Sequence, residues 1–154
     1  MTIVVRQARP EDAPEVARLN LAFNGPGTSV EYITARLAEP APAERIFLAE
    51  VDGRAAGLAG LRLLRCALSA TPYAELTELF VEEPHRRRGV ASALLAHVEG
   101  VAREAGAERL VLLTAWDNGG AHAFYHARGY RLWCLAMARD LARPAAEGGG
   151  QGVL

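Results

Sequence analysis

The chain has 154 residues, and none of its 17 basic residues is a lysine. Without a lysine, no Schiff base can form on a side-chain amine and no Walker phosphate loop is complete, which argues against pyridoxal-phosphate enzymes, lysine aldolases and P-loop ATPases. A net charge of -1 with 51% apolar residues predicts a folded chain with no general attraction to nucleic acid or anionic membranes.

The cysteines and the apolar runs indicate where such a protein works. Cys66 and Cys134 lie far apart and form no CxxC pattern. Two cysteines in a chain of this size do not suggest a disulfide scaffold, and such cysteine usage is typical of proteins in the reducing cytoplasm. No run approaches the roughly 18 apolar residues of a transmembrane helix, and the first residues lack the apolar core of a secretion signal. We therefore expect a cytoplasmic protein with no membrane partner and no nucleic-acid partner.

Hydrophobic periodicity and turn residues divide the chain into alternating strands and helices. Asp52-Gly53 predicts a tight hairpin, and Gly106 and Gly129 end the last two helices. The expected elements are strand 2–6, helix 12–24, a second helix from Thr28 or Ser29 to about 39, strand 45–51, strand 55–65, loop 66–73, strand 75–81, basic loop 84–89, helix 90–105, strand 109–114, a helix from Asp117 or Asn118 to 128, and strand 130–138.

The expected fourth strand, Glu75–Val81, has an interrupted pattern. Leu76 and Glu78 are expected to share one face, and the three residues from Leu79 are then apolar without a break. Such a run is typical of a buried strand, or of one that is bulged near Leu79.

This order of elements predicts an α/β fold with a mixed sheet. The front half is expected to be antiparallel, and the back half contains one strand-helix-strand unit. No linker interrupts the pattern, so we expect a single domain over residues 1–143. The glycine-rich stretch 144–154 is expected to be a disordered tail.

The strand ending at Val81 leads through Arg86-Arg87-Arg88-Gly89 into a helix that no side chain caps. The first N–H groups of a helix lack internal partners and carry the positive end of the helix dipole, so small residues there allow a phosphate to approach. Arginines add charge and forked donors. The alternative interpretation is an arginine-rich turn exposed to water.

Two spaced motifs resemble those of the GNAT superfamily of N-acetyltransferases. The basic loop matches the signature Q/R-x-x-G-x-G/A as Arg86-x-x-Gly89-x-Ala91. The late helix is similar to the motif N-x-x-A-x-x-x-Y-x-x-x-G-F/Y, as Asn118-x-x-Ala121-x-x-Phe124-Tyr125-x-x-x-Gly129-Tyr130. The resemblance covers roughly residues 2–140, and it implies a GNAT-type acyl-CoA N-acyltransferase fold in which the central strands four and five splay apart.

The resemblance further implies acetyl-CoA as a co-substrate. Its pyrophosphate is expected on the backbone N–H groups of residues 87–92, with Arg86 and Arg88 lending charge. Its pantetheine arm is expected to pair like an extra strand at the splayed edge, and Asn118 is expected to bond the arm. The donor-binding residues implied in this way are Leu79, Val81, Arg86, Arg87, Arg88, Gly89, Val90, Ala91, Ser92 and Asn118.

Transfer from a thioester to an amine needs a base and an acid. Glu78, on the fourth strand, is the candidate base through a water molecule, and Tyr125 is the candidate acid for the departing thiolate. The backbone N–H near Val81 is a candidate to polarise the thioester carbonyl. The alternatives are that Glu78 is a solvated strand residue, in competition with the other acids Glu75, Glu82 and Glu83, and that Tyr125 only packs.

No metal is expected. His122 and His126 lie four residues apart on one predicted helix, but neither an HExxH motif nor a third ligand accompanies them. A cysteine nucleophile is equally disfavoured, since no partnered histidine accompanies Cys66 or Cys134 in a motif.

The resemblance thus predicts an N-acetyltransferase that acts by direct attack in a ternary complex, with a small-molecule amine as acceptor. The first two helices, from Phe23 to Tyr32, and the loop Cys66–Tyr73 are expected to hold the acceptor. The alternatives are a peptide or protein amine, an aminoglycoside-type acceptor, and a non-catalytic module that binds or senses acyl-CoA. A homodimer is a further possibility that the family suggests.

Overall fold

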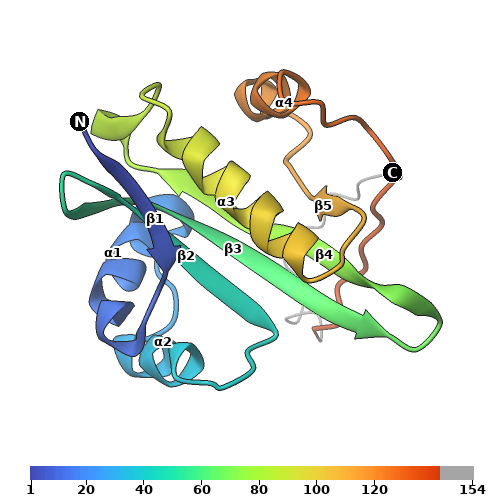
Figure 1. The fold of residues 1–154 in the computed structure, drawn as a ribbon, viewed down its shortest axis with the longest axis horizontal. Coiled ribbons are helices and arrows are strands. Elements are labelled where there is room, and N and C mark those ends of the chain that lie inside the picture. The colour runs from blue at the N-terminus through green and yellow to red at the C-terminus, as the bar shows by residue number, and fades with distance from the viewer. Residues whose placement is uncertain (143–154) are drawn as a thin grey trace, which may run out of the picture. The chain divides into compact units, whose positions relative to one another are not determined.

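A five-stranded sheet in the order β1-β2-β3-β4-β5 frames the first part of the chain (Figure 1). The computed structural model describes residues 1–142, which separate after Leu113 into two units that are described here one at a time. The expected single domain over residues 1–143 stays a prediction. Residue 143 and the expected disordered tail, 144–154, lie outside the described residues.

The first unit holds eight of the labelled elements, and the second unit holds α4. The elements are β1 (Ile3–Gln7), α1 (Ala13–Asn24), α2 (Val30–Leu37), β2 (Glu44–Val51), β3 (Arg54–Cys66), β4 (Ser69–Val81), α3 (Val90–Glu104), β5 (Leu110–Leu112) and α4 (Gly119–His126). Single 3₁₀ turns, Pro10–Asp12 and Glu83–His85, precede α1 and follow β4.

The expected mixed α/β sheet is confirmed. Strands β1 to β4 pair antiparallel, and β5 joins β4 in parallel through the crossover helix α3. Asp52 and Gly53 both have positive φ, of 50° and 81°, which is the backbone of a type I′ hairpin turn and confirms the hairpin expected there. Ser29 caps α2 by accepting a hydrogen bond from the Tyr32 N–H at 3.1 Å.

The loop expected over residues 66–73 does not exist. Strands β3 and β4 instead continue to a hairpin in which Cys66 pairs with Ser69 and only Ala67 and Leu68 turn. Pro72 lies in this hairpin, where the register jumps from Leu64 to Cys66. A proline has no N–H to give to the ladder, and an irregular stretch of this kind does not require one.

The bulge in β4 lies at Thr77, two residues before the position expected for it. Gly60 pairs with Glu78 and its neighbour Leu61 pairs with Leu76, so Thr77 has no partner of its own on β3. Because adjacent residues of β3 face opposite sides, Leu76 and Glu78 do not share a face, contrary to the expectation. The bulge therefore turns the Glu78 side chain away from the face that buries Leu76.

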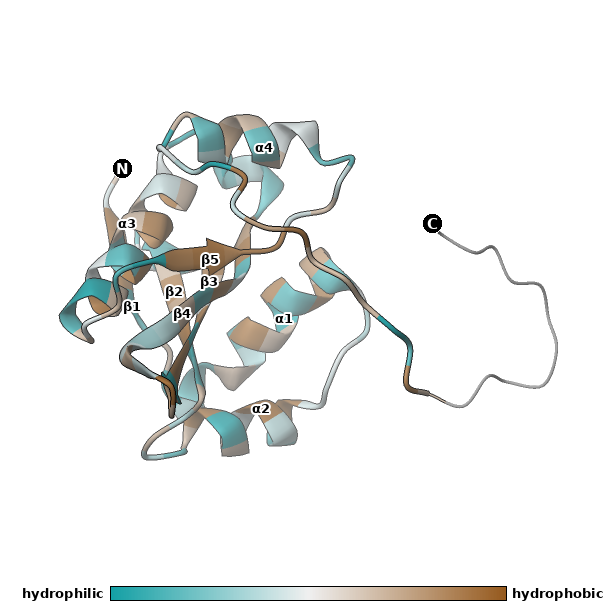
Figure 2. Ribbon diagram, turned by 90° about the vertical axis from the view of Figure 1, so that its right-hand side faces the viewer, coloured by the Kyte–Doolittle hydropathy of each residue, from teal (hydrophilic) through white to brown (hydrophobic). Residues whose placement is uncertain are grey.

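Helices cover both faces of the sheet, with α1 and α2 on one side and α3 on the other (Figure 2). Under α1, the buried cluster contains Val16 and Leu19 against Leu48, Leu58 and Phe80. A Cβ added to Gly57 would lie 2.6 Å from the Phe80 carbonyl oxygen and 3.3 Å from Leu94 Cδ1. The strand therefore needs a glycine at this position, chiefly because the β4 backbone lies so close. The residues that α3 buries are Val90, Leu94, Leu95, Val98 and Ala102.

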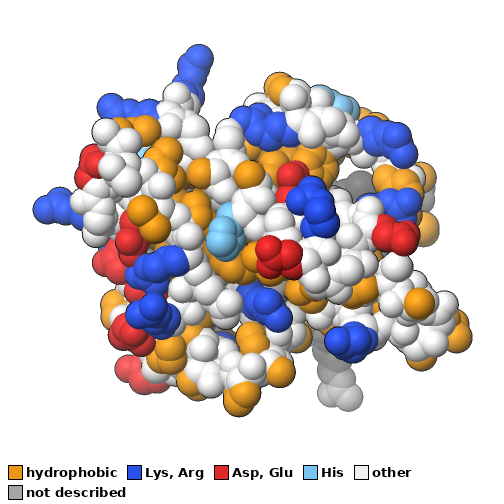
Figure 3. All heavy atoms as spheres, in the orientation of Figure 1, with side chains coloured by type: hydrophobic (Ala, Val, Ile, Leu, Met, Phe, Trp, Pro, Cys, Tyr) orange, Lys and Arg blue, Asp and Glu red, His pale blue; other side chains and the backbone are white. Residues whose placement is uncertain are grey.

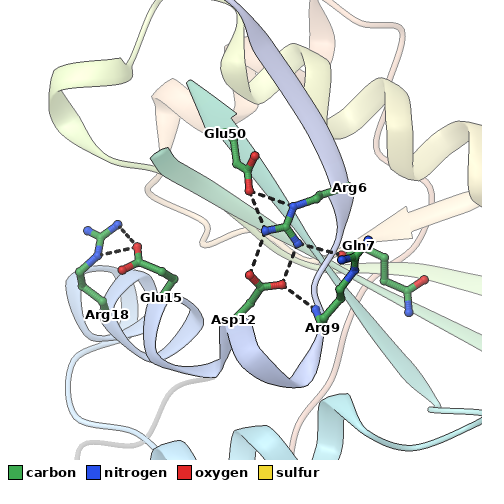
Figure 4. Close-up of polar contacts among 7 residues, drawn as sticks. All are labelled: Arg6, Gln7, Arg9, Asp12, Glu15, Arg18 and Glu50. Carbon is green, nitrogen blue, oxygen red and sulfur yellow. Dashed lines mark hydrogen bonds and ion pairs between the residues drawn. The ribbon is translucent and has the colours of Figure 1, made fainter. Parts of the chain in front are cut away.

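An ion-pair cluster ties β1 to β2 and to the turn before α1 (Figure 4). Both terminal nitrogens of Arg6 donate to the Asp12 carboxylate, at 2.7 and 2.9 Å, and Arg6 Nε donates to Glu50 at 2.9 Å. Asp12 also accepts from the Arg9 N–H at 2.7 Å. These bonds hold the pKa of Asp12 down at about 2, chiefly through Arg6.

The second unit contains α4, which starts where expected and ends at His126, two residues before the expected position 128. Asn118 caps it by accepting from the Ala121 N–H at 3.0 Å, and Gly129 follows it with φ 85°. The strand expected at 130–138 is absent, since the described residues after α4 form neither helix nor strand. An apolar run forms a strand only where a neighbouring strand supplies hydrogen-bond partners for its backbone. No described strand of the sheet pairs with residues 130–138.

The surface shows mixed charge on the face that α3 crosses. Basic and acidic side chains alternate there over short distances (Figure 3), in keeping with a net charge of -1. Within residues 1–142, no helix combines the length and the apolar character that a membrane crossing requires.

Candidate active site

The free edge of β4 is the first component of the site. β5 pairs with β4 only from Ala74 to Leu76, so the rest of β4 has no partner on that side within the described sheet. The Glu82 N–H donates to the Ala56 carbonyl of β3 at 2.9 Å. Since backbone groups alternate along a strand, the N–H and C=O groups of Leu79 and Val81 face away from β3, toward the open edge. An extended ligand can pair there like a strand.

The start of α3 is the second component. Arg87 and Gly89 have left-handed backbone, with φ 60° and 86°, and together they turn the chain from the 3₁₀ turn into the helix. The first helical bond runs from the Ala93 N–H to the Gly89 carbonyl at 2.9 Å, and no side chain caps the helix. The N–H groups of Val90 and Ala91 therefore have no acceptor within the helix, as an anion site requires.

The three arginines before Gly89 do not behave alike. All three are exposed residues of the loop, and they differ in their contacts. Arg86 is expected to lend charge to the pyrophosphate, but its Nε donates to the Val81 carbonyl at 2.9 Å and its guanidinium lies 5.9 Å from the centre of the Phe80 ring. One of the three guanidinium groups is therefore engaged with β4.

Glu78 lies partly buried on the face of the sheet that α1 covers. Its Oε2 accepts a long hydrogen bond, 3.5 Å, from Asn24 Nδ2 at the end of α1, and Asn24 Nδ2 also donates to Asn20 Oδ1 at 2.8 Å. Burial raises the pKa of Glu78, the Asn24 amide opposes the rise, and the charge of Glu44 adds to it. A carboxylate of raised basicity accepts a proton more readily near neutral pH.

The three competing acids have other engagements or positions. Glu75 bonds to Arg62 at 3.3 Å, and Glu82 pairs with Arg18. Glu83 is exposed in the 3₁₀ turn, beyond the strand. Glu78 is bonded to an amide instead of a guanidinium, so its proton affinity is not lowered by an arginine.

Glu44 and Asn24 are residues of this region that the sequence did not single out. Glu44 begins β2 and bonds through its Oε1 to Thr77 Oγ1, next to the bulge. A Cβ on Gly60 would lie 2.1 Å from Thr77 Oγ1 and 3.1 Å from Glu44 Oε1, so only a glycine fits beneath this contact. Glu44 comes near Glu78 only through the register of β2 on β3 and of β3 on β4. A local sequence pattern does not predict a contact between residues so far apart in the chain.

The second unit carries the other two predicted residues. The Tyr125 ring contacts the rings of Phe124 and Tyr130, with centroids 5.2 and 5.5 Å away, and burial raises the pKa of its phenol. Asn118 uses its side-chain oxygen to cap α4. The roles of Tyr125 as an acid and of Asn118 as a pantetheine ligand stay predictions.

The two histidines of α4 are engaged with backbone carbonyls. His122 Nε2 lies 3.0 Å from the Ala115 oxygen, and His126 Nδ1 lies 3.0 Å from the Tyr130 oxygen. Over the described range 1–142, no three side chains of His, Cys, Asp or Glu come together as metal ligands would. Cys66 and Cys134 are both free thiols on exposed residues.

The family model described as the acetyltransferase (GNAT) family matches residues 14–130. An aminoglycoside N(6')-acetyltransferase type 1 of Stenotrophomonas maltophilia is 33% identical over 131 residues, which are 82% of this chain and 84% of the relative. An aminoalkylphosphonate N-acetyltransferase of Salmonella typhimurium is 37% identical over 84 residues, 54% of either chain.

Solved structures show the same fold. A putative acetyltransferase from Agrobacterium tumefaciens superposes with a TM-score of 0.79 at 25% identity, over 89% of this chain and 99% of that one. Aminoglycoside acetyltransferase AAC(6')-Iy, in complex with a CoA bisubstrate analogue, gives a TM-score of 0.77 at 21% identity, over 92% of this chain and all of its own. With the family model covering most of the chain, the protein belongs to the acetyltransferase (GNAT) family and is an acetyl-CoA-dependent N-acetyltransferase.

Proposed function

We propose that the protein acetylates a primary amine of a small cationic molecule, by direct attack of the amine on acetyl-CoA in a ternary complex. The observation that carries the proposal is the placement of Glu78. This carboxylate has raised basicity and no arginine partner, and it lies one residue before the open backbone edge at Leu79.

The chemistry follows from that placement. Glu78 takes a proton from the acceptor ammonium through a water molecule, and the free amine then attacks the thioester carbon. A tetrahedral intermediate forms, and its oxyanion is stabilised by the Val81 N–H. The C–S bond breaks as Tyr125 gives a proton to the departing thiolate, and the acetyl group stays on nitrogen. The raised pKa of Tyr125 keeps the phenol protonated for this step. The acetylated nitrogen then releases its second proton, which returns through water to the Tyr125 phenolate and restores the phenol.

The donor is held by backbone groups in the proposal. The N–H groups of residues 87–92 take the pyrophosphate at the positive end of α3, with charge from Arg88. At the open edge the backbone groups of Leu79 take the pantetheine arm, the Val81 N–H is kept for the thioester oxygen, and Asn118 adds a side-chain contact.

Charge supports a cationic acceptor. Glu44, Glu75 and Glu78 lie on the sheet face that α1 and α2 cover, with Arg62 as the cation paired to Glu75. An ammonium or an amino sugar with several amines suits such a surface, while a phosphonate would meet net negative charge. We therefore favour an acceptor of the aminoglycoside or polyamine type over an aminoalkylphosphonate. The relative from Stenotrophomonas maltophilia is named for an aminoglycoside acceptor, and the relative from Salmonella typhimurium for the phosphonate. A peptide amine is the second candidate.

Free-thiol release from acetyl-CoA over a panel of acceptors tests the proposal. The panel contains aminoglycosides, linear diamines, an aminoalkylphosphonate and peptides with a free N-terminus. We expect the highest kcat/KM with an acceptor that carries two or more amines. A preference for the phosphonate or for peptides would contradict the proposed acceptor class. Tight acetyl-CoA binding with no turnover on any amine would favour a sensing module.

A further inference from the structure

Arg86 turns its side chain back toward the sheet. Its Nε donates to the Val81 carbonyl at 2.9 Å, and its guanidinium lies over the Phe80 ring, 5.9 Å from the ring centre. Phe80 is only 8% exposed and stacks on Phe23 of α1, with ring centroids 5.0 Å apart and an angle of 22° between the planes. Arg86 is thus part of a column that runs from the phosphate loop through the end of β4 to α1.

The carbonyl that Arg86 binds belongs to the open edge. Val81 is the last residue of β4, and its backbone groups face away from β3. A carbonyl at the end of an unpaired edge has no ladder donor, and Arg86 supplies one. The bond therefore holds the peptide plane between Val81 and Glu82, and with it the end of β4, directly after the Val81 N–H that carries the oxyanion in the proposed reaction.

We propose that Arg86 is a positioning residue of the thioester end of the site and not a ligand of the pyrophosphate. The contribution of Arg86 is the N–H donor on Nε, the nitrogen attached to Cδ, which bonds the Val81 carbonyl. Glutamine carries a nitrogen on Cδ as well, without the charge. Lysine keeps the charge but puts its nitrogen one bond further out.

The variants Arg86→Gln and Arg86→Lys separate the two roles. If the nitrogen at Cδ matters, Arg86→Gln keeps kcat/KM within about twofold of the parent, while Arg86→Lys loses about tenfold, the value of one net hydrogen bond. If the charge matters, the order reverses. Both changes are conservative, and a circular-dichroism melt of each variant reports whether it folds as the parent does.

Two donors give the second arm of the test. S-acetylpantetheine has the thioester and the arm of acetyl-CoA but no pyrophosphate. We expect Arg86→Lys to lower kcat/KM with both donors by the same factor. The matched control Arg88→Gln, in the same loop, should lower it with acetyl-CoA alone. A loss at Arg86 that is confined to acetyl-CoA, or an Arg86→Gln variant as impaired as Arg86→Lys, would overturn the proposal.

The inference uses the donor half of the site, so it is tested apart from the proposed acceptor. Titration calorimetry with CoA and with pantetheine needs no amine. The dissociation constants should follow the same order, with Arg86→Gln near the parent and Arg86→Lys weakened for both ligands. If the acceptor panel fails while this order holds, the proposed function is wrong and the role of Arg86 stands. If Arg86→Lys weakens CoA alone, the role of Arg86 is wrong.

Discussion

At the scale of single residues, the site depends on how the surroundings of Glu78 set its proton affinity. Withdrawal from water raises its pKa most, the Asn24 amide favours the charged form, and Glu44 disfavours it. The sequence suggested Glu78 because of its place on the strand. It gave no hint of Glu44 or Asn24, which reach Glu78 only through the strand register and the end of α1.

Changes at Glu78 and Glu44 should have different effects on the pH profile. We expect Glu78→Gln to lower kcat by about 10²–10⁴-fold, the usual contribution of a general base. Glu44→Gln should keep most of kcat and move the acidic midpoint of kcat/KM to lower pH, because removal of a neighbouring negative charge favours ionised Glu78. Steady-state rates across pH, with the best amine of the panel, check both.

The opposite shift provides the control. Asn24→Ala removes a hydrogen bond to the charged form and should move the same midpoint to higher pH. The basic limb of the profile should stay in place in both variants if it reflects the tyrosine or the acceptor amine. An acidic midpoint that neither Glu44→Gln nor Asn24→Ala moves would assign the base to another group.

At the scale of elements, patterns that are local in sequence predicted the structure well. The amphipathic run after Gly89 became α3, Asp52-Gly53 became the hairpin, and Asn118 became the cap of α4. The failures depend on pairing between distant segments. The bulge at Thr77 and the hairpin that replaces the expected loop at 66–73 are set by β3, and the strand expected at 130–138 lacks a described partner.

Gly89 is the element-scale test of the anion site. With φ 86° it disfavours any side chain, by about 1–2 kcal/mol, although a Cβ there would meet nothing within 4 Å. Gly89→Ala and Gly89→Glu share this strain, and only the second adds a negative charge at the helix start. We expect the KM for acetyl-CoA to rise a further tenfold or so in Gly89→Glu relative to Gly89→Ala.

Gly100 in the middle of α3 is the matched control. A Cβ there also meets nothing within 4 Å, and its φ is not positive, so Gly100→Ala should stabilise the fold by about 0.5–1 kcal/mol and leave the donor KM unchanged. Equal donor KM values for Gly89→Ala and Gly89→Glu would mean that no phosphate binds at this helix start.

At the scale of the first unit as a whole, the two halves of the proposed site share their supports. The Arg86–Phe80–Phe23 column connects the phosphate loop to the helix that carries Asn24. On the same sheet, the Arg6 cluster joins β1, β2 and the turn that starts α1. The position of α1 over Glu78 thus depends on contacts at both of its ends.

The Arg6 cluster should give the protein a stability that acid removes. Asp12 has a pKa of about 2 in the fold, against an ordinary value of 3.8, so its contribution is complete above about pH 4 and is lost as the pH falls toward 2. Asp12→Asn should lower the free energy of unfolding by about 1–3 kcal/mol at pH 7, and its difference from the parent should vanish near pH 2.

The control is Glu15→Gln, which removes the nearby ion pair with Arg18. The Glu15 side chain is 48% exposed, against 14% for the Asp12 side chain. An exposed pair contributes less than about 1 kcal/mol. Urea unfolding from pH 7 to about pH 2 measures both variants. An Asp12→Asn deficit that stays constant with pH would show that the carboxylate charge is not what stabilises the turn.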